Sequence, residues 1–456
     1  MMTKHTFFRI AVTVIILTVA LLCAVNVICA EEGTSPRILN VRDFGAVGDG
    51  VTDDTPAMLR AIAELRDGDT LYIPAGTYLI REYGERDILL VMDLTDLSVV
   101  MEEETIIQLD TVADDALPLG NRHLVFHFHR CHNLTVTGGT ILGDRLNYTG
   151  TARVDQGFGL RLSDCKGVTV RDVEIAHLRG DGIVVSSRDT DENGIRQRCY
   201  DVTIDNCHIY GCVRNGITVS SVDGCVISNT VIHDIQGLDP QAAVDIEAEH
   251  EGTYNRNVTI DHCHFYNNGI LSVAITGVSH NITVKSSVLE QQFVQSEEGD
   301  GLRLWDCTMG LVCLSGKNVV IENSRIHQLR LYGSHVTCSN TVFDGTGDWI
   351  PFRVLVTKSD GTTVGHFENC TFRGRGLCAL GGCIVYCHTP PAEMTFSDCN
   401  FKSCGLIPFL GKLETVEREG CFFGLGWALW LCILGLIALV FLLVHRRRKK
   451  KVWVCK

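Results

Sequence analysis

The phrase VTIDNCHI at residues 202–209 returns almost unchanged as VTIDHCHF at residues 258–265. Each copy alternates apolar and polar residues with a period of two, as a strand with one buried face does. No copy is followed by a helical pattern, and the mean step between copies is near 28 residues. The sequence therefore predicts a strand that recurs once per coil without crossover helices. Looser copies begin at Leu134, Val168, Cys225, Ile282, Val319, Val336, Gly365 and Met394.

Strands that recur at this spacing fit a parallel β-helix, in which coils stack at about 4.8 Å and bury a continuous column of side chains. A β-propeller is the main alternative, but it needs about four strands per 40 residues and a blade signature, and neither is found. The aligned copies also predict a column of small interior side chains, preceded by a column of turn asparagines. The interior column holds Cys207, Thr230, Cys263, Ser287, Ser324, Thr341, Cys370 and Cys399. The turn column holds Asn206, Asn229, Asn323, Asn340 and Asn369.

The two ends of the chain carry long apolar stretches. Residues 1–30 have two early basic residues, an apolar run and a small residue before the first acids, which predicts a secretory signal peptide. Residues 424–444 contain no charge and reach roughly 30 Å as a helix, which predicts one membrane span. Six basic residues at 446–451 then predict a cytoplasmic C-terminus, so we expect a single-pass type I protein of the cell membrane with an extracellular domain.

The composition excludes several classes of protein. A chain of 456 residues with 45% hydrophobic residues and only 9 prolines is not disordered, collagen-like or a small disulfide scaffold. Residues 31–423 hold 31 basic and 54 acidic residues, a charge of -23 that repels nucleic acid. An acidic polysaccharide would need a bridging cation or a local cluster of arginines on such a surface.

Seventeen cysteines lie within residues 31–423, an odd number that cannot pair completely. Their place in the repeat favours a role in the core. The spacing of Cys378, Cys383 and Cys387 is too irregular to favour zinc, and we predict no metal site of this kind.

The phrase NVRDFGAVGDGVTDDTP at residues 40–56 precedes the repeats. Pro56 behind Asp54 and Thr55 is typical of a helix start, and residues 57–65 have helical spacing, which predicts a cap over the first coil. This phrase and LYIPAGTY at residues 71–78 resemble the opening of the pectate-lyase-like superfamily, the rhamnogalacturonase and epimerase-like β-helix proteins. The resemblance implies a right-handed parallel β-helix that acts on or binds polysaccharide, and it leaves the reaction open.

These observations divide the chain into six expected parts. They are a signal peptide (1–30), a cap segment (31–66), a parallel β-helix (67–405), a juxtamembrane linker (406–423), a transmembrane helix (424–444) and a basic cytoplasmic tail (445–456). One departure from the resemblance limits the function. The polygalacturonase branch carries a Gly-His-Gly element, whereas this chain has Gly180-Asp181-Gly182 and no Gly-His-Gly.

A second strand in each coil contains the strongest candidates for catalysis. Counting from the repeat aligns residues 158–161, 183–186, 217–220, 244–247, 273–276 and 302–305, with alternate residues pointing outward. Asp245 and Glu247 then share an outer face, and we predict that they are the catalytic carboxylates. The predicted substrate-binding residues around them are Trp305, Arg303, Arg161, Asp181, Asp300 and His250.

Paired carboxylates on one strand face are the groups that break glycosidic bonds, and an exposed tryptophan stacks on a sugar ring. We therefore predict a glycoside hydrolase-like protein whose partner is a polysaccharide. Two alternatives stay open. A Ca²⁺ ion on Asp245 and Glu247 would make Arg303 the base of a calcium-dependent lyase, and a surface without chemistry would bind glycan or protein only.

Overall fold

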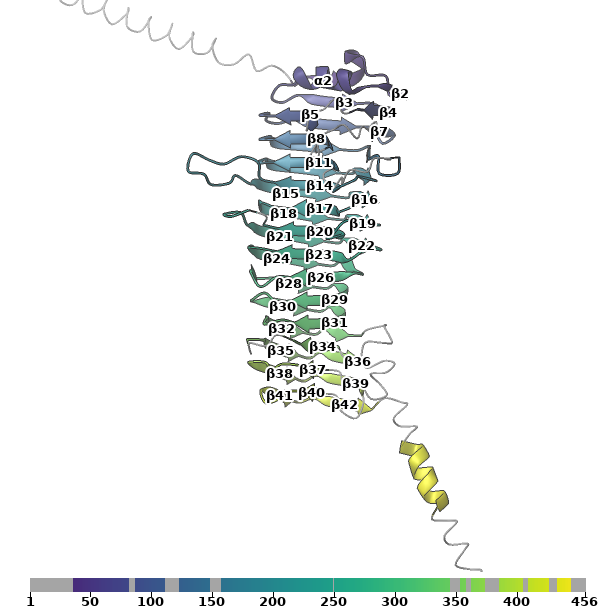
Figure 1. Ribbon diagram of the computed structural model, residues 1–456, viewed down its shortest axis with the longest axis vertical. Coiled ribbons are helices and arrows are strands. Elements are labelled where there is room, and N and C mark those ends of the chain that lie inside the picture. The colour runs from purple at the N-terminus through teal and green to yellow at the C-terminus, as the bar shows by residue number, and fades with distance from the viewer. Residues whose placement is uncertain are drawn as a thin grey trace, which may run out of the picture.

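The computed structural model describes residues 36–81, 87–110, 123–147, 157–248, 250–344, 353–357, 362–373, 385–404, 409–425 and 433–443. The chain winds into a long column of stacked coils (Figure 1). Two sheets of 16 and 26 strands run along it, and each strand pairs in parallel with its counterpart on the next coil. The predicted parallel β-helix is confirmed.

A full coil contributes three strands, and these form three ladders along the column. The first ladder, the 16-stranded sheet, consists of β1 (Ile38–Asn40), β3 (Thr70–Ile73), β6 (Ser98–Met101), β9 (His132–Thr137), β12 (Lys166–Arg171), β15 (Cys199–Asp205), β18 (Val222–Ser228), β21 (Asn255–Asp261), β24 (Ser279–Lys285), β27 (Gly299–Asp300), β28 (Arg303–Trp305), β30 (Val319–Glu322), β32 (His335–Ser339), β35 (Val364–Glu368), β38 (Glu393–Ser397) and β41 (Val416–Glu419).

The other two ladders merge into the 26-stranded sheet because β29 (Thr308–Leu314) and β31 (Arg325–Leu331) belong to both. The second ladder also contains β2 (Asp49–Asp53), β4 (Gly76–Ile80), β7 (Thr105–Leu109), β10 (Thr140–Leu142), β13 (Glu174–Ala176), β16 (His208–Tyr210), β19 (Val231–His233), β22 (His264–Tyr266), β25 (Val288–Leu289), β33 (Val342–Phe343), β36 (Thr371–Arg373), β39 (Asn400–Cys404) and β42 (Phe422–Leu425). The third also contains β5 (Asp87–Met92), β8 (His123–His129), β11 (Gly157–Ser163), β14 (Ile183–Ser186), β17 (Asn215–Val219), β20 (Ala242–Glu247), β23 (Leu271–Thr276), β26 (Gln292–Gln295), β34 (Val354–Val356), β37 (Val385–Cys387) and β40 (Phe409–Gly411).

The repeated phrase explains the corner between the first and second ladders. Its apolar residues, such as Val202 and Ile204, are buried in the column. The following asparagine takes a left-handed conformation, with φ of 49° at Asn206, a region that asparagine tolerates better than most residues. The next residue turns inward, and Cys207 is buried with its backbone N–H donating to Thr230 Oγ1 at 3.3 Å. The two predicted columns are thus confirmed as a corner motif.

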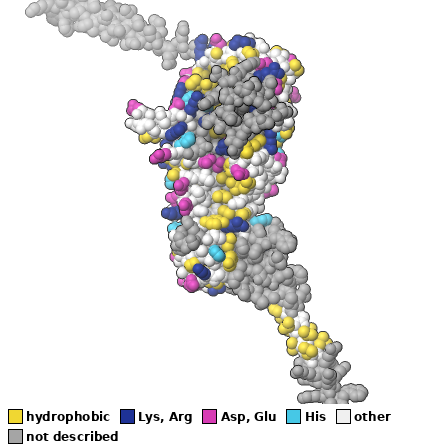
Figure 2. All heavy atoms as spheres, viewed as in Figure 1, with side chains coloured by type: hydrophobic (Ala, Val, Ile, Leu, Met, Phe, Trp, Pro, Cys, Tyr) yellow, Lys and Arg dark blue, Asp and Glu magenta, His cyan; other side chains and the backbone are white. Residues whose placement is uncertain are grey.

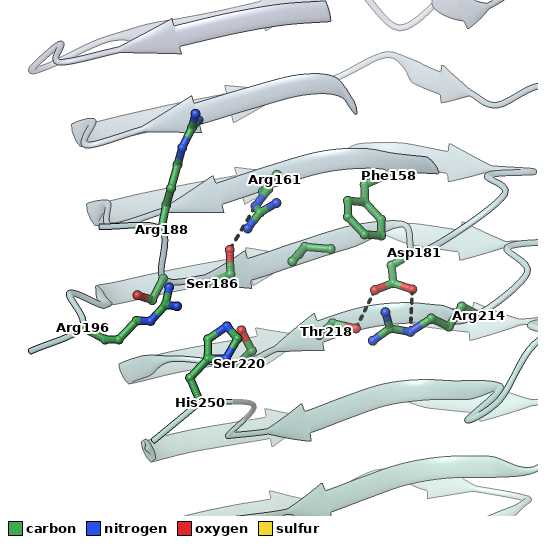
Figure 3. Close-up of a pocket in the computed structure, with 12 residues that line it drawn as sticks. Phe158, Arg161, Asp181, Ser186, Arg188, Arg196, Arg214, Thr218, Ser220 and His250 are labelled. Carbon is green, nitrogen blue, oxygen red and sulfur yellow. Dashed lines mark hydrogen bonds and ion pairs between the residues drawn. The ribbon is translucent and has the colours of Figure 1, made fainter. Parts of the chain in front are cut away.

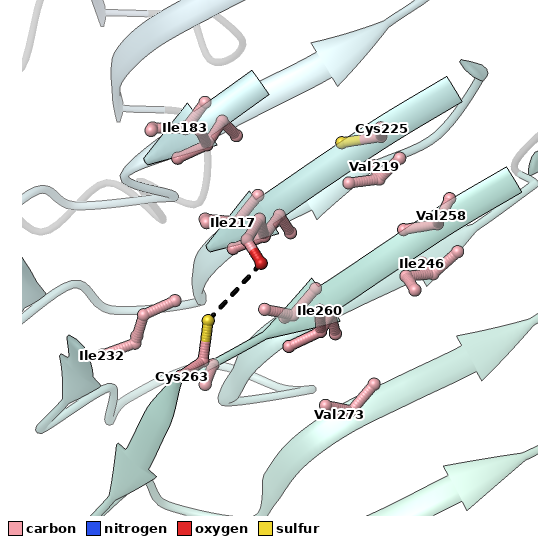
Figure 4. Close-up of a cluster of buried hydrophobic side chains, with 14 of the residues drawn as sticks. Ile183, Ile217, Val219, Cys225, Ile232, Ile246, Val258, Ile260, Cys263 and Val273 are labelled. Carbon is pink, nitrogen blue, oxygen red and sulfur yellow. Dashed lines mark hydrogen bonds between the residues drawn. The ribbon is translucent and has the colours of Figure 1, made fainter. Parts of the chain in front are cut away.

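The core is a stack of aliphatic side chains with cysteine thiols between them (Figure 4). Fourteen cysteines among the described residues are free, and all but one are buried. Burial raises the pKa of Cys225 to about 12, so this thiol stays protonated at neutral pH. Cys387 lies in the core strand β37, whereas Cys378 and Cys383 lie outside the described residues. These thiols serve as small apolar side chains, as the repeat predicts.

The N-terminal end is closed as expected. A short 3-10 helix, η1 (Val41–Phe44), leads to α2 (Thr55–Ala63), whose Met58 and Ala61 are buried in the core. The Asp54 carboxylate accepts the backbone N–H groups of Val47 and Gly48 at 2.6 and 3.1 Å, so it fixes the preceding loop. Asp49 and Asp53 likewise accept backbone N–H groups within turns, and the cap covers the first coil (Figure 1).

The coils extend further along the chain than the sequence indicated. Segment 406–423, expected as a linker, contains β40 and β41, which pair with β37 and β38, and β42 continues to Leu425. Of the expected membrane span, residues 424–425 end strand β42 and residues 433–443 form a helix. Among the residues that the structure describes, no helix is both long and apolar enough to cross a bilayer. The expected signal peptide lies outside the described residues.

Candidate functional site

An open cleft lies on the outer face of the third ladder, across β11, β14 and β17 (Figure 3). Its volume is about 390 Å³. The side chains along its floor are short, with Ser186 on one coil and Thr218 and Ser220 on the next. Because short side chains leave space between larger neighbours, the floor is hollowed. The cleft is lined by Phe158, Arg161, Asp181, Val184, Ser186, Ser187, Arg188, Arg196, Arg214, Thr218, Ser220 and His250.

Four arginines make this cleft cationic in an otherwise acidic molecule. Arg161 is almost buried, and its Nε donates to Ser163 Oγ and Ser186 Oγ at 3.1 Å each, which orients the guanidinium. Arg188 and Arg196 come from the connection between β14 and β15, a hairpin closed by an antiparallel bridge between Thr190 and Arg196. This hairpin, residues 187–198, projects from the column (Figure 1). Figure 2 shows acidic side chains scattered over the surface of the molecule.

A chain of hydrogen bonds joins Asp181, which lines the cleft, to the buried Asp245 of β20 beside it. Thr218 Oγ1 donates to Asp181 Oδ2 at 2.8 Å, and Asn215 Nδ2 lies 3.0 Å from Thr218 Oγ1 and 3.2 Å from Asp245 Oδ2. Arg214 Nε lies 3.6 Å from Asp181 Oδ1 (Figure 3). These contacts keep the two carboxylate oxygens within about 9 Å of each other, a limit that allows the separations of both retaining and inverting glycosidases.

The two carboxylates differ in their surroundings. Asp245 is 3% exposed, and burial, followed by the nearby charge of Glu247, raises its pKa to about 7. Arg214 opposes that shift only in part. Asp181 instead has Arg214 at its carboxylate, and an adjacent cation favours the charged form of an acid. The site therefore places an acid whose pKa is near neutral, Asp245, close to a second buried acid, Asp181, that contacts a guanidinium.

The structure brings together part of the predicted site. Asp245 and Glu247 share the outer face of β20 as expected, and Arg161, Asp181 and His250 line the adjoining cleft. Glu247 is half-buried at the end of the strand and acts on the charge of Asp245. The predicted roles of these residues stay predictions.

The placement of Arg303, Trp305 and Asp300 beside Asp245 is wrong. Residues 303–305 form β28 in the first ladder, where Arg303 pairs with Thr283, and Asp300 lies in β27 of the same sheet. The third ladder continues instead through Gln292–Gln295, whose Phe293 pairs with Val273. Trp305, at 45% exposed, therefore lies on another face of the column and is no platform beside Asp245.

The reason for this error is a missed copy of the repeat. LRLWDCTM at residues 302–309 has the repeated pattern, with Cys307 in the interior column and Asp306 in the left-handed position at φ of 55°. The coil from Ile282 to Leu302 has 20 residues, and the coil from Leu302 to Val319 has 17. An alignment based on the mean step of about 28 residues therefore misses the copy at Leu302. The match of residues 302–309 to the repeat was the signal in the sequence that could have revealed this coil.

A second register error concerns β11. The alignment of residues 158–161 with 183–186 is shifted by two, because Leu160 pairs with Ile183. In addition, Phe158 does not point inward as predicted, because its ring lies on the cleft wall (Figure 3). It clusters there with Leu124 and Val184. The alignment gave no indication of this apolar strip.

Several cleft residues were not predicted from the sequence. Arg188 and Arg196 follow a strand end in a short segment rich in arginine, which was the available signal. The signal for Arg214, Asn215 and Thr218 was weaker. Asn215 occupies on its coil the position that Asp181 occupies on the preceding coil. Among the described residues, one group of three metal-type ligands, His129, Asp164 and Asp189, lies at the base of the hairpin.

Two family models match the chain. One, described as rhamnogalacturonase A/epimerase, pectate lyase-like, matches residues 38–85, and one for the right-handed β-helix region matches residues 193–347. Among curated proteins, the uncharacterized protein YclG of Bacillus subtilis is 29% identical over 263 residues, which cover 52% of this chain and 43% of the relative. The mannuronan C5-epimerase AlgE5 of Azotobacter vinelandii is 28% identical over 271 residues, which cover 54% of this chain and 26% of the relative.

Among solved structures, PfbA, a surface adhesin of Streptococcus pneumoniae, matches with a TM-score of 0.54. The two chains are 16% identical, and the match covers 85% of this chain and 91% of the PfbA chain. This likeness concerns the fold alone. The matched segments span less than half the length of the two curated relatives. The parallel coils, the N-terminal phrase and these matches agree: the chain belongs to the pectate-lyase-like family of right-handed β-helix proteins, related to mannuronan C5-epimerases and rhamnogalacturonases.

Proposed function

We propose that the chain acts on a carboxylate-bearing polysaccharide and hydrolyses a glycosidic bond in the cleft across β11, β14 and β17. The observation that supports this most is the charge of the cleft. Four arginines and His250 line it beside one acid, Asp181, in a chain whose net charge is -14. Guanidinium groups bind carboxylates in a bidentate manner, and the surrounding negative surface disfavours anions elsewhere.

The proposed chemistry uses the two carboxylates at the end of the cleft. Asp245, whose pKa is raised to about 7, is protonated often enough at neutral pH to serve as the general acid. Asp181, held by Thr218 and Arg214, serves as the base that activates water. Glu247 takes a new role in this scheme, since its charge keeps the proton on Asp245. The strip of Phe158 and Val184 supplies an apolar wall for a sugar ring.

The test incubates the purified full-length chain with polygalacturonate, alginate and neutral glucans. New reducing ends are expected from a uronate polymer only, and Asp181→Asn and Asp245→Asn are each expected to lower the rate at least 100-fold. Asp300→Asn is the matched control, because Asp300 also stands between two glycines but lies in the other sheet.

Three other outcomes would each contradict hydrolysis. Unsaturated ends that depend on calcium would establish a lyase. A change of C5 configuration without chain cleavage would establish an epimerase, the activity named for AlgE5. Binding of a glycan or protein with no product from any polymer would establish a binding module.

We also propose that the protein is exported and held at the cell membrane by the uncharged stretch that follows β42, residues 426–444, with the cleft outside the cell. The uncharged length of that stretch and the basic residues after it support this orientation. Protease added to intact cells is expected to remove the β-helix and leave the basic tail protected. Release of the whole chain by salt or alkali would contradict the anchor.

A further inference from the structure

We propose that Arg130 is a positioning residue, which holds the 187–198 hairpin against the column and so places the two arginines that this hairpin brings to the cleft. What these arginines bind rests on the proposed function, whereas the hold on the hairpin is a property of the fold. Arg130 directly follows β8, as Asp93 follows β5 and Asp164 follows β11. The register pairs the last residues of these strands with one another. The three charged residues therefore occupy the same corner on successive coils.

The guanidinium of Arg130 contacts two carboxylates from different coils. Its Nε and Nη2 donate to Asp93 Oδ1 and Oδ2 at 2.6 and 2.7 Å, a bidentate pair that fixes the plane of the group. The remaining nitrogen, Nη1, donates to Asp189 Oδ2 at 2.6 Å and lies 2.7 Å from Nε2 of His129. Single exposed ion pairs contribute little, but bidentate geometry and a network of charges are the exceptions. Arg130 thus connects the coil of β5 to the hairpin.

The backbone at this corner indicates that the arginine side chain is needed. Arg130 has a φ of 52°, beside 60° at Asp93 and 56° at Asp164. Aspartate tolerates this left-handed region, whereas arginine enters it at a greater cost. Such a cost persists only where the surrounding contacts offset it. The contacts of the guanidinium with Asp93 and Asp189 supply this compensation.

The base of the hairpin rests on the neighbouring carboxylate of Asp164. The backbone N–H groups of Arg188 and Asp189 donate to this carboxylate at 2.9 to 3.1 Å. Because Nε2 of His129 accepts from Arg130, Nδ1 carries the ring proton and faces Asp164 Oδ2 at 3.7 Å. Arg130 and Asp164 therefore hold Asp189 from two sides, the first at its side chain and the second at its backbone.

Asp189 in turn connects the two legs of the hairpin. Its backbone C=O accepts the N–H of Gln197 at 2.9 Å, and an antiparallel bridge joins Thr190 to Arg196. A contact that fixes Asp189 therefore also limits the movement of Arg196 on the opposite leg.

This hold concerns the cleft because Arg188 and Arg196 line it. Arg188 immediately precedes Asp189, and its Nη1 lies 3.5 Å from Nδ1 of His127 in β8. Figure 3 shows both arginine side chains on the same side of the cleft. Guanidinium groups that are held in place before binding lose less freedom when they bind an anion. Arg130 therefore acts on substrate affinity through these two arginines, without touching the substrate itself.

The first measurement is trypsin cleavage within 187–198 in the purified full-length chain without polymer, followed by mass spectrometry. Arg130→Met is expected to speed this cleavage about 10-fold, because the hairpin opens more often. Asp189→Asn is expected to do the same, and the double variant no more than either, since both changes break the same link. Arg81→Met is the matched control, because Arg81 also pairs with an aspartate one coil on, Asp110, and is 38% exposed against 40% for Arg130.

The second measurement is the binding of polygalacturonate and of alginate by calorimetry. Arg130→Met is expected to weaken binding of the preferred polymer about 10-fold, and to raise KM by a similar factor with kcat within about twofold of wild type. Arg130→Lys separates position from charge. Lysine keeps the positive charge but lacks the planar fork that contacts Asp93 with two atoms and Asp189 with a third. This variant is expected to behave like Arg130→Met in both measurements.

Unchanged hairpin cleavage in Arg130→Met would overturn the proposal, whether or not any polymer is cleaved. Faster cleavage with unchanged polymer affinity would overturn the positioning role. Full recovery of affinity in Arg130→Lys would do so as well, because it would assign the effect to charge alone. A wild-type chain that binds no uronate polymer would contradict the proposed function, and the cleavage of the hairpin would still decide whether Arg130 holds it.

Discussion

Two outer faces of the same coils have opposite characters. On the third ladder, short side chains such as Ser186 and Thr218 leave the arginine-lined cleft. On the second ladder, rings fill the surface instead. His233 stacks between Tyr210 and Tyr266, with ring centroids 5.2 and 4.7 Å apart and planes within 10° of parallel. The strands of both faces are parallel and in register, so side-chain size alone decides whether a coil presents a hollow or a filled wall.

The difference also concerns which groups face the solvent. The stacked His233 ring covers one face of Tyr210 and one face of Tyr266. In the cleft, the single ring of Phe158 packs against Leu124 and Val184 and is 6% exposed. One outer face of the coils is therefore filled by stacked rings, and another is hollowed.

The largest expected effect comes from placing an aromatic ring in the cleft, like the rings on the second ladder. Thr218→Tyr places a ring between Asp181 and Asp245 and removes the hydroxyl that donates to Asp181. We expect activity on the preferred polymer to fall at least 100-fold, because substrate is excluded and the base loses a hydrogen bond. The same change at Thr283, which pairs with Arg303 in the first ladder, is the control. Equal loss in both variants would mean that the cleft is not the site.

The next effect concerns the buried acid. The pKa of Asp245 is raised to about 7 by burial and by Glu247, so the folded state binds a proton that the unfolded chain releases above about pH 4. Stability is then lost as pH rises from about 4 to 7. We expect Asp245→Asn to be more stable than wild type by about 2 to 4 kcal/mol at pH 8. Urea unfolding at pH 4 and pH 8 measures the difference, which should vanish at the lower pH.

The sequence predicted the coil far better than its outer faces. Alternation and the Asn–Cys corner at residues 206–207 depend on neighbours along the chain, so they are visible in the sequence. Which coil follows which depends on coil length, and the short coil that begins at Leu302 shifted Trp305 onto the wrong face. Arg214 and Thr218 meet Asp181 only across coils, through residues more than 30 positions apart. Such contacts become visible only when every register is correct.

A smaller effect is expected on the filled face. Tyr266→Ala removes one ring from the stack on His233, which contributes about 1 kcal/mol. We expect a loss of stability of that size and no change in activity, because the residue is remote from the cleft lining. Chemical unfolding and the polymer assay measure the two quantities. A loss of activity with unchanged stability would show that the ring face takes part in substrate binding.

The smallest expected effect concerns His208, whose contribution to stability depends on pH in the opposite direction to that of Asp245. Burial, followed by the neighbouring His233, lowers the pKa of His208, and the two Nε2 atoms are 2.9 Å apart. A histidine whose pKa is lowered on folding stabilises the protein above its unfolded value near 6.5, and this stability is lost as pH falls. Since His208 is 45% exposed, solvent screening keeps the contribution below about 1 kcal/mol. We expect His208→Gln to reduce the loss of stability between pH 7 and pH 5, measured by urea unfolding, whereas Asp245→Asn acts at higher pH.

The control for this prediction is His264→Gln, in the same column two coils on. An equal change in stability in that variant would assign the effect to surface charge in general rather than to the His208–His233 pair.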